Sequence, residues 1–127
     1  MSERKKIVIV GGVAGGMSAA ARLRRLDEEA EIVVLERTGY VSFANCGLPY
    51  YLGREITEFD DLVLQTPQAL ASRFCLDVRV SHEARHIDVE KRTVSGVNLT
   101  NGESFELPYH DLILSVGAQP ILSLIHI

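Results

Sequence analysis

The chain has 127 residues, and its 13 basic and 17 acidic side chains give a formal net charge of −4. With 46% hydrophobic and 24% charged residues, its composition is that of a folded domain and excludes a disordered chain. The length allows one modest core. No apolar run is long enough for a membrane span, and no basic block indicates a nucleic-acid partner. Two cysteines are too few for a disulfide framework or for a metal site of the usual zinc spacing.

The first forty residues predict a strand, a helix and a second strand. Residues 7–10 and 32–35 are apolar, β-branched runs, as in strands that a parallel sheet buries on both faces. Residues 14–26 between them predict a crossover helix, so the segment is a βαβ unit. The glycines within residues 7–21 argue against a signal peptide in this charge-free stretch. We therefore expect a cytoplasmic protein.

The predicted helix has two faces of different character. Helical spacing gathers apolar side chains on one side, with Ala20 flanking them: Ala19, Leu23 and Leu26. It gathers a polar stripe on the opposite side: Ser18, Arg22 and Arg25. The apolar face is expected to pack on the sheet, and the polar stripe is either a solvated face or a site for an anionic ligand.

The rest of the chain predicts a helix-containing excursion followed by short strands. One helix is expected from Cys46 to Gly53, and another from Pro67 to Phe74 with Thr66 as its cap. Strands are predicted over residues 76–80, 84–88, 93–99, 104–107 and 111–116. Asn101-Gly102 supplies a hairpin turn. The sequence thus predicts an α/β fold, a Rossmann-like βαβ unit with an antiparallel β-meander insertion.

The turn Gly11-Gly12-Val13-Ala14-Gly15-Gly16 joins the first strand to the first helix. A dinucleotide pyrophosphate requires close backbone approach and free amides at a helix N-terminus, which such a turn provides. Val13 replaces the middle glycine of the usual pattern. Glu36 follows the second strand, where an acid hydrogen-bonds a ribose hydroxyl. The alternative is a turn that serves packing alone, but turn, helix, strand and acid together favour dinucleotide binding.

Cys46 lies in the stretch Ser42-Phe43-Ala44-Asn45-Cys46-Gly47. Just before a predicted helix, its thiolate would be favoured by the positive end of the helix dipole, and Ser42 and Asn45 can donate hydrogen bonds nearby. Most isolated cysteines are small buried hydrophobes, and Cys75 fits that description. No second cysteine lies close in sequence, so a local dithiol centre is excluded, and Cys46 would have to pair with an external thiol or react with oxygen.

Three segments in this order resemble the single-cysteine FAD-dependent pyridine nucleotide-disulfide oxidoreductases: the glycine turn, residues 42–51, and residues 112–118. The resemblance is closest to coenzyme A-disulfide reductases, including rhodanese-fused forms that act on persulfides or polysulfides. It implies that Cys46 is the redox cysteine and that the FAD cofactor is reduced by NAD(P)H. The implied cofactor-binding residues are Gly11, Gly12, Val13, Ala14, Gly16, Glu36, Arg37, Ala84, Gly117 and Ala118.

The resemblance also implies a coenzyme A subsite formed by Ser18, Arg22, Arg25, Ser42 and Asn45. Two guanidinium groups on one helix stripe suit a phosphate-bearing thiol. A lysine common in this pocket of the family is replaced here by Phe74, with Arg73 beside it, which weakens the assignment of the substrate.

Two other functions stay open. One is an NADH oxidase or peroxidase of the same family with a cysteine-sulfenic acid cycle, although its assisting histidine is replaced by Ala14. The other is a non-catalytic dinucleotide-binding module. We expect three of the four histidines, His82, His86 and His110, to be surface residues.

The resemblance implies that the chain is incomplete. Residues 1–121 correspond to the N-terminal part of the FAD/NAD(P)-binding domain, and family members add a nicotinamide domain and a dimer domain. Residues 122–127 look like a translated sequencing adapter, a non-native tail. We expect the full-length protein to be a homodimer and the isolated chain to have little turnover.

Overall fold

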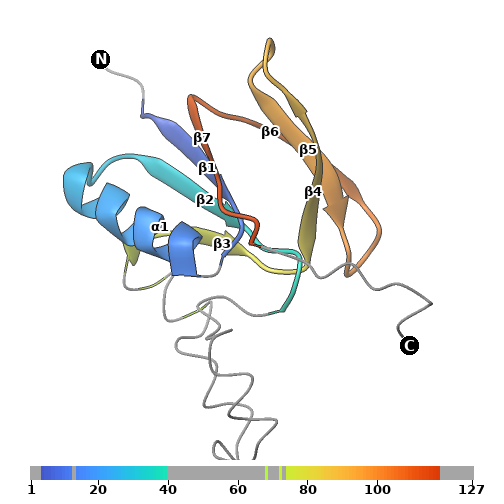
Figure 1. Ribbon diagram of the computed structural model, residues 1–127, viewed down its shortest axis with the longest axis horizontal. Helices are drawn as coiled ribbons and strands as arrows, with labels where there is room; N and C mark the ends of the chain where they lie inside the picture. The colour runs from blue at the N-terminus through green and yellow to red at the C-terminus, as the bar shows by residue number, and fades with distance from the viewer. Residues whose placement is uncertain (1–3, 13, 40–67, 69–71, 73, 118–127) are drawn as a thin grey trace, which may run out of the picture.

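The computed structural model of the chain describes residues 4–12, 14–39, 68, 72 and 74–117. Its elements follow the chain in this order: β1 (Lys6–Val10), α1 (Ala14–Leu26), β2 (Glu31–Leu35), β3 (Asp77–Arg79), β4 (His82–Asp88), β5 (Thr93–Asn98), β6 (Ser104–Pro108) and β7 (Asp111–Leu114). The α/β prediction of a βαβ unit with an antiparallel insertion is confirmed (Figure 1). Within these described ranges, no helix has the length and apolar character needed to cross a membrane.

The first sheet is parallel, with the strand order β3-β2-β1-β7. Its centre is the β-branched run of β1, where Val8 lies opposite Val33 of β2 on one side and Leu112 of β7 on the other. The chain leaves β1 towards β2 through α1 and returns to the other side of β1 as β7. The strand order therefore reverses at β1, which makes its carboxyl end the topological switch point of the sheet.

Both faces of this sheet are covered, because successive strand residues point to opposite sides. One face packs with α1 into a buried cluster: Ile7, Ile9, Met17, Ala20, Ala30, Ile32, Val34 and Leu76. The other face packs against the antiparallel sheet β4-β5-β6 in a second buried cluster: Val8, Val33, Leu35 and Val94. Figure 1 shows the resulting layers, with α1 and β4–β6 on opposite sides of β1 and β2.

The prediction for the inner face of α1 is wrong at Leu26, whose side chain is 68% exposed. Met17 and Ala20 are buried in the core instead, and Leu23 is only partly buried beside it. At 100° per residue, Leu26 lies on the opposite side of the helix from Met17. The inner face therefore follows the positions of Met17, Ala20 and Arg24.

The described strands agree with the predicted ones to within two residues at each end. The strand predicted over residues 76–80 is limited to Asp77–Arg79, and the strand predicted to end at residue 116 ends at Leu114. Gln68, Ser72 and Phe74 are helical, as expected, and the helix predicted over residues 46–53 lies outside the described residues. The prediction that Cys75 is a buried hydrophobe is wrong, because its side chain is exposed after this helical segment. Gly102 has a φ of +76° in the β5–β6 hairpin, where its amide donates to the carbonyl of Asn98 at 2.8 Å.

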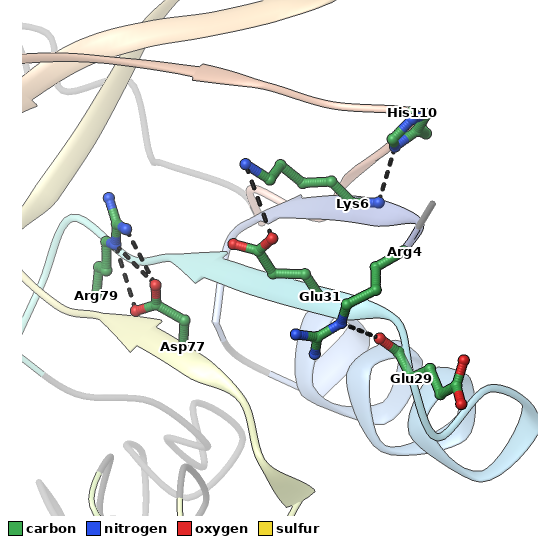
Figure 2. Close-up of polar contacts among 7 residues, drawn as sticks. All are labelled: Arg4, Lys6, Glu29, Glu31, Asp77, Arg79 and His110. Atoms are coloured by element: carbon green, nitrogen blue, oxygen red, sulfur yellow. Dashed lines mark hydrogen bonds and ion pairs between the residues drawn. The ribbon is translucent and has the colours of Figure 1, made fainter. Parts of the chain in front are cut away.

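Polar contacts fasten the amino ends of the parallel strands (Figure 2). The amide of Lys6 donates to Nδ1 of His110 at 2.8 Å, and the amide of His110 donates to the carbonyl of Lys6 at 2.8 Å. The Lys6 ammonium lies 3.8 Å from the Glu31 carboxylate, and Arg4 Nε donates to the Glu29 carbonyl at 2.7 Å. His110 is exposed, as predicted, but its ring accepts a backbone hydrogen bond that ties β1 to the start of β7.

Candidate functional site

Three of the described segments meet at the carboxyl edge of the parallel sheet. Gly11 follows β1, Glu36 follows β2 and Ser115 follows β7. The amide of Gly11 donates to the carbonyl of Leu35 at 2.8 Å, and the amide of Ser115 donates to the carbonyl of Val10 at 2.8 Å. These bonds continue the sheet for one residue beyond its strands. They place the glycine turn at the switch point, where open α/β sheets bind their ligands.

The glycine turn is packed so tightly that two of its positions cannot carry a side chain. Gly11 has a φ of +105°, and a Cβ there would collide with the carbonyl oxygen of Ser115. A Cβ on Gly16 would collide with the carbonyl oxygen of Gly11 and would lie 3.2 Å from a methyl group of Ile9. Gly11 therefore permits the tight turn, and Gly16 permits the close packing of α1 on the turn and on β1. Because neither glycine has a side chain, the N-terminus of α1 can lie against the edge of the sheet.

The amino end of α1 is suited to an anion. The helix begins at Ala14 and has no acidic residue in its first turn, so no carboxylate of its own first turn opposes the positive end of its dipole. First-turn amides lack intrahelical acceptors, and such amides bind phosphate groups in dinucleotide-binding proteins. Gly15 of this turn is exposed.

Glu36 is the one buried acidic residue in the described part of the chain, with 7% of its surface exposed. Its Oε1 accepts the amide of Gly12 at 3.0 Å. Its Oε2 accepts the amide of Thr38 at 2.8 Å and the Thr38 hydroxyl at 2.7 Å. The carboxylate therefore adjoins the glycine turn, because the amide of Gly12 donates to it.

The residues predicted for the thiol substrate lie partly on α1. Ser18, Arg22 and Arg25 are all exposed, which agrees with a shared polar stripe. Within the described ranges, neither Arg22 nor Arg25 has a hydrogen bond or an ion pair. No contact with the described residues therefore keeps either guanidinium group from binding an anionic ligand.

Sequence reasoning missed Arg24, which lies between those two arginines. Its guanidinium donates four hydrogen bonds to backbone carbonyls, in order of length to Phe74 at 2.8 Å, Glu28 at 2.9 Å, Cys75 at 3.0 Å and Asp27 at 3.2 Å. Arg24 thus ties the end of α1 to the segment that enters β3. The available signal was its helical spacing from Ala20, which places it on the inner face.

The other predicted residues are only partly described. Ala84 is half-buried in β4, beside a register irregularity between Ala84 and His86, and Arg37 is exposed. Gly117 is exposed and has a φ of +73°. Ala14 begins α1. The remaining predicted positions lie outside the described residues: Val13, Ser42, Asn45, Cys46 and Ala118.

Comparison with known proteins gives consistent matches. Residues 5–126 match the family described as pyridine nucleotide-disulphide oxidoreductase. Coenzyme A disulfide reductase of Staphylococcus haemolyticus is 42% identical over 114 residues, which are 90% of this chain and 26% of that protein.

Two solved structures extend this result. The crystal structure of reduced Bacillus anthracis CoADR-RHD has a TM-score of 0.93 and 52% identity, covering 97% of this chain and 22% of that chain. The NAD-dependent persulfide reductase from A. fulgidus has a TM-score of 0.85 and 39% identity, covering 91% of this chain and 22% of that chain. The chain therefore spans about a quarter of the length of the relatives it matches.

Proposed function

Because the chain belongs to the pyridine nucleotide-disulphide oxidoreductase family, we propose that it is the N-terminal part of an FAD-dependent NAD(P)H oxidoreductase. Its substrate would be coenzyme A disulfide or a related persulfide or polysulfide, reduced through Cys46 in a homodimeric full-length protein. The observation that carries the proposal is the similarity to coenzyme A disulfide reductase along nine-tenths of the chain.

The described residues fit the cofactor. The family uses FAD and NAD(P)H. The open amino end of α1 would receive the pyrophosphate, and the buried Glu36 beside Gly12 would accept a hydrogen bond from the adenosine ribose. Arg37, Ala84, Gly117 and Ala118 would complete the cofactor site. When bound, FAD would pass two electrons from NAD(P)H to the disulfide formed at Cys46.

The arginines of α1 support a phosphate-bearing substrate. Arg22 and Arg25 share the exposed stripe with Ser18 and have no hydrogen bond or ion pair with the described residues. Arg24, in contrast, donates its hydrogen bonds to backbone carbonyls. We therefore assign Arg22 and Arg25 to the phosphates of coenzyme A, together with Ser18, Ser42 and Asn45.

Cys46 would act as the nucleophile. Its thiolate attacks one sulfur of coenzyme A disulfide, forms a mixed disulfide and releases one coenzyme A thiolate, which takes up a proton from solvent. Two electrons and one proton then break the mixed disulfide, which releases the second coenzyme A thiol and restores the Cys46 thiolate. The overall reaction consumes one NAD(P)H and one proton for each disulfide.

The test is steady-state NAD(P)H oxidation by the full-length protein containing this chain, with coenzyme A disulfide, polysulfide, peroxide and oxygen as separate acceptors. We expect Cys46→Ser to abolish disulfide reduction, while the matched variant Cys75→Ser leaves it unchanged. Undiminished disulfide reduction in Cys46→Ser would refute the proposal. Turnover with peroxide or oxygen alone would identify the oxidase or peroxidase, and no turnover with bound nucleotide would identify the binding module.

The extent of the natural protein is tested separately. We propose that residues 1–121 belong to the cofactor-binding domain and that residues 122–127 are not native. Sequencing of the genomic locus should show an open frame that diverges from this chain after residue 121, and a stop codon directly after Ile127 would contradict it.

A further inference from the structure

The hydroxyl of Thr38 takes part in the candidate site without having been predicted there. Glu36 Oε2 accepts two hydrogen bonds from Thr38, one from its amide at 2.8 Å and one from its hydroxyl at 2.7 Å. Glu36 Oε1 accepts one hydrogen bond, from the amide of Gly12 at 3.0 Å. The two oxygens of this buried carboxylate therefore have different environments.

A carboxylate offers about four acceptor positions, two on each oxygen. Thr38 fills both positions of Oε2, and Gly12 fills one position of Oε1. Among the contacts of the described residues, the remaining position is on Oε1, the oxygen beside the glycine turn. An incoming ribose hydroxyl would therefore bond to Oε1, and the orientation of the carboxylate decides whether that oxygen is presented to it.

Thr38 is itself held by the backbone around it. Its carbonyl accepts the amide of Ser81 at 2.9 Å. The backbone of Glu36 is held on both sides, since its amide donates to the carbonyl of Arg79 and its carbonyl accepts the amide of His82, each at 3.0 Å. Thr38 and Glu36 are thus fixed to the same crossing between β2 and β4, so the Thr38 hydroxyl can set the rotation of the carboxylate.

We infer that Thr38 is a positioning residue for cofactor binding: by occupying Glu36 Oε2, it directs Oε1 to the adenosine ribose at the glycine turn. It acts through Glu36 and need not touch the cofactor. This inference rests on the proposed binding of FAD, and it adds a residue outside the glycine turn that tunes the affinity for the dinucleotide.

The test is the FAD dissociation constant of the full-length apoprotein, measured by flavin fluorescence. Thr38→Val removes the hydroxyl but keeps the backbone amide, and we expect FAD to bind about five- to tenfold more weakly, as for one lost hydrogen bond of ordinary strength. Thr38→Ser keeps the hydroxyl and should bind FAD as the wild type does. FMN lacks the adenosine ribose, so its dissociation constant should be the same in all three proteins.

The variant Glu36→Gln distinguishes a failure of the role of Thr38 from a failure of the proposed ribose contact. If Glu36→Gln binds FAD as tightly as the wild type, the ribose contact of the proposed function is wrong. If Glu36→Gln binds weakly but Thr38→Val binds normally, the role of Thr38 is refuted and the proposed function stands. Equal weakening in Thr38→Ser and Thr38→Val, or an equal loss of FMN affinity, would also overturn the role of Thr38.

Discussion

The two sheets of this chain differ in how their faces are used. The parallel sheet has α1 on one face and the antiparallel sheet on the other, and three consecutive residues at the centre of β1 are buried: Ile7, Val8 and Ile9. The antiparallel sheet packs one face on the core, and in β6 exposed and half-buried residues alternate. A strand buried on both faces reads as a continuous apolar run, whereas a strand covered on one face alternates.

The candidate site lies at the edge of the parallel sheet, and the antiparallel sheet supports it. The candidate residues gather where the doubly covered strands end, at Gly11, Glu36 and Ser115, because the layers on both sides fix the backbone there. The antiparallel sheet contributes Val94 to the core and holds Glu36 through the amide of His82. Substitutions should therefore cost most at the carboxyl edge and inside the parallel sheet, and less elsewhere.

The largest effect is expected at the turn that ends β1. Gly11→Ala should lower the free energy of unfolding by at least about 3 kcal/mol, because the residue has a positive φ and a Cβ would collide with Ser115. Gly39→Ala is the matched control, since a Cβ there meets no atom within 4 Å. Urea denaturation of both variants measures the difference, and equal losses would show that the turn is not tightly packed.

The interior of the two sheets gives the next comparison. Ile9→Ala removes a fully buried side chain and should cost about 3 kcal/mol. Val97→Ala in β5 removes a half-buried side chain and should cost about 1 kcal/mol. If urea denaturation gave the same cost for both, the assignment of the parallel sheet as the better-covered layer would fail.

Loss of the Arg24 hydrogen bonds at the end of α1 should have an intermediate effect. Arg24→Ala leaves four carbonyls without their donor, and we expect a loss of about 2 kcal/mol in the free energy of unfolding. Arg25→Ala, one residue later on the exposed stripe, should change it by less than about 0.5 kcal/mol. Thermal or urea denaturation showing an equal loss in both variants would contradict the separate roles of these arginines.

The smallest effect is expected at the amino edge of the sheet, far from the candidate site. His110→Ala removes the acceptor of the Lys6 amide and should cost about 1 kcal/mol. His110→Asn offers a side-chain oxygen in the place of Nδ1 and should restore most of that stability. Hydrogen exchange of the Lys6 amide provides a local check, since it should accelerate in His110→Ala and stay slow in His110→Asn.

The elements that depend on local pattern were predictable from the sequence, and the contacts between distant segments were not. The buried runs of β1 and β2, the glycine turn and the position of Glu36 all leave a signature in adjacent residues. Leu26 was misplaced because a face drawn through neighbouring leucines ignored Met17, which the structure buries.

The missed residues bind backbone groups. Arg24 reaches carbonyls up to 51 residues away, and His110 accepts an amide 104 residues away. A backbone carbonyl or amide is the same at every position, so nothing in the sequence marks its partner. Thr38 is only two residues from Glu36, but the sequence does not show that the Glu36 carboxylate is buried and accepts hydrogen bonds from Thr38.

The most direct test of the account is the absorbance of the full-length flavoprotein with its cysteines reduced and its flavin oxidised, in the long-wavelength region where a thiolate in contact with oxidised flavin absorbs. With one sulfur acting beside FAD, we predict such a band in the wild type and in Cys75→Ser and its loss in Cys46→Ser. A band of equal intensity in Cys46→Ser would contradict the account, because the electrons would then reach the substrate through another group.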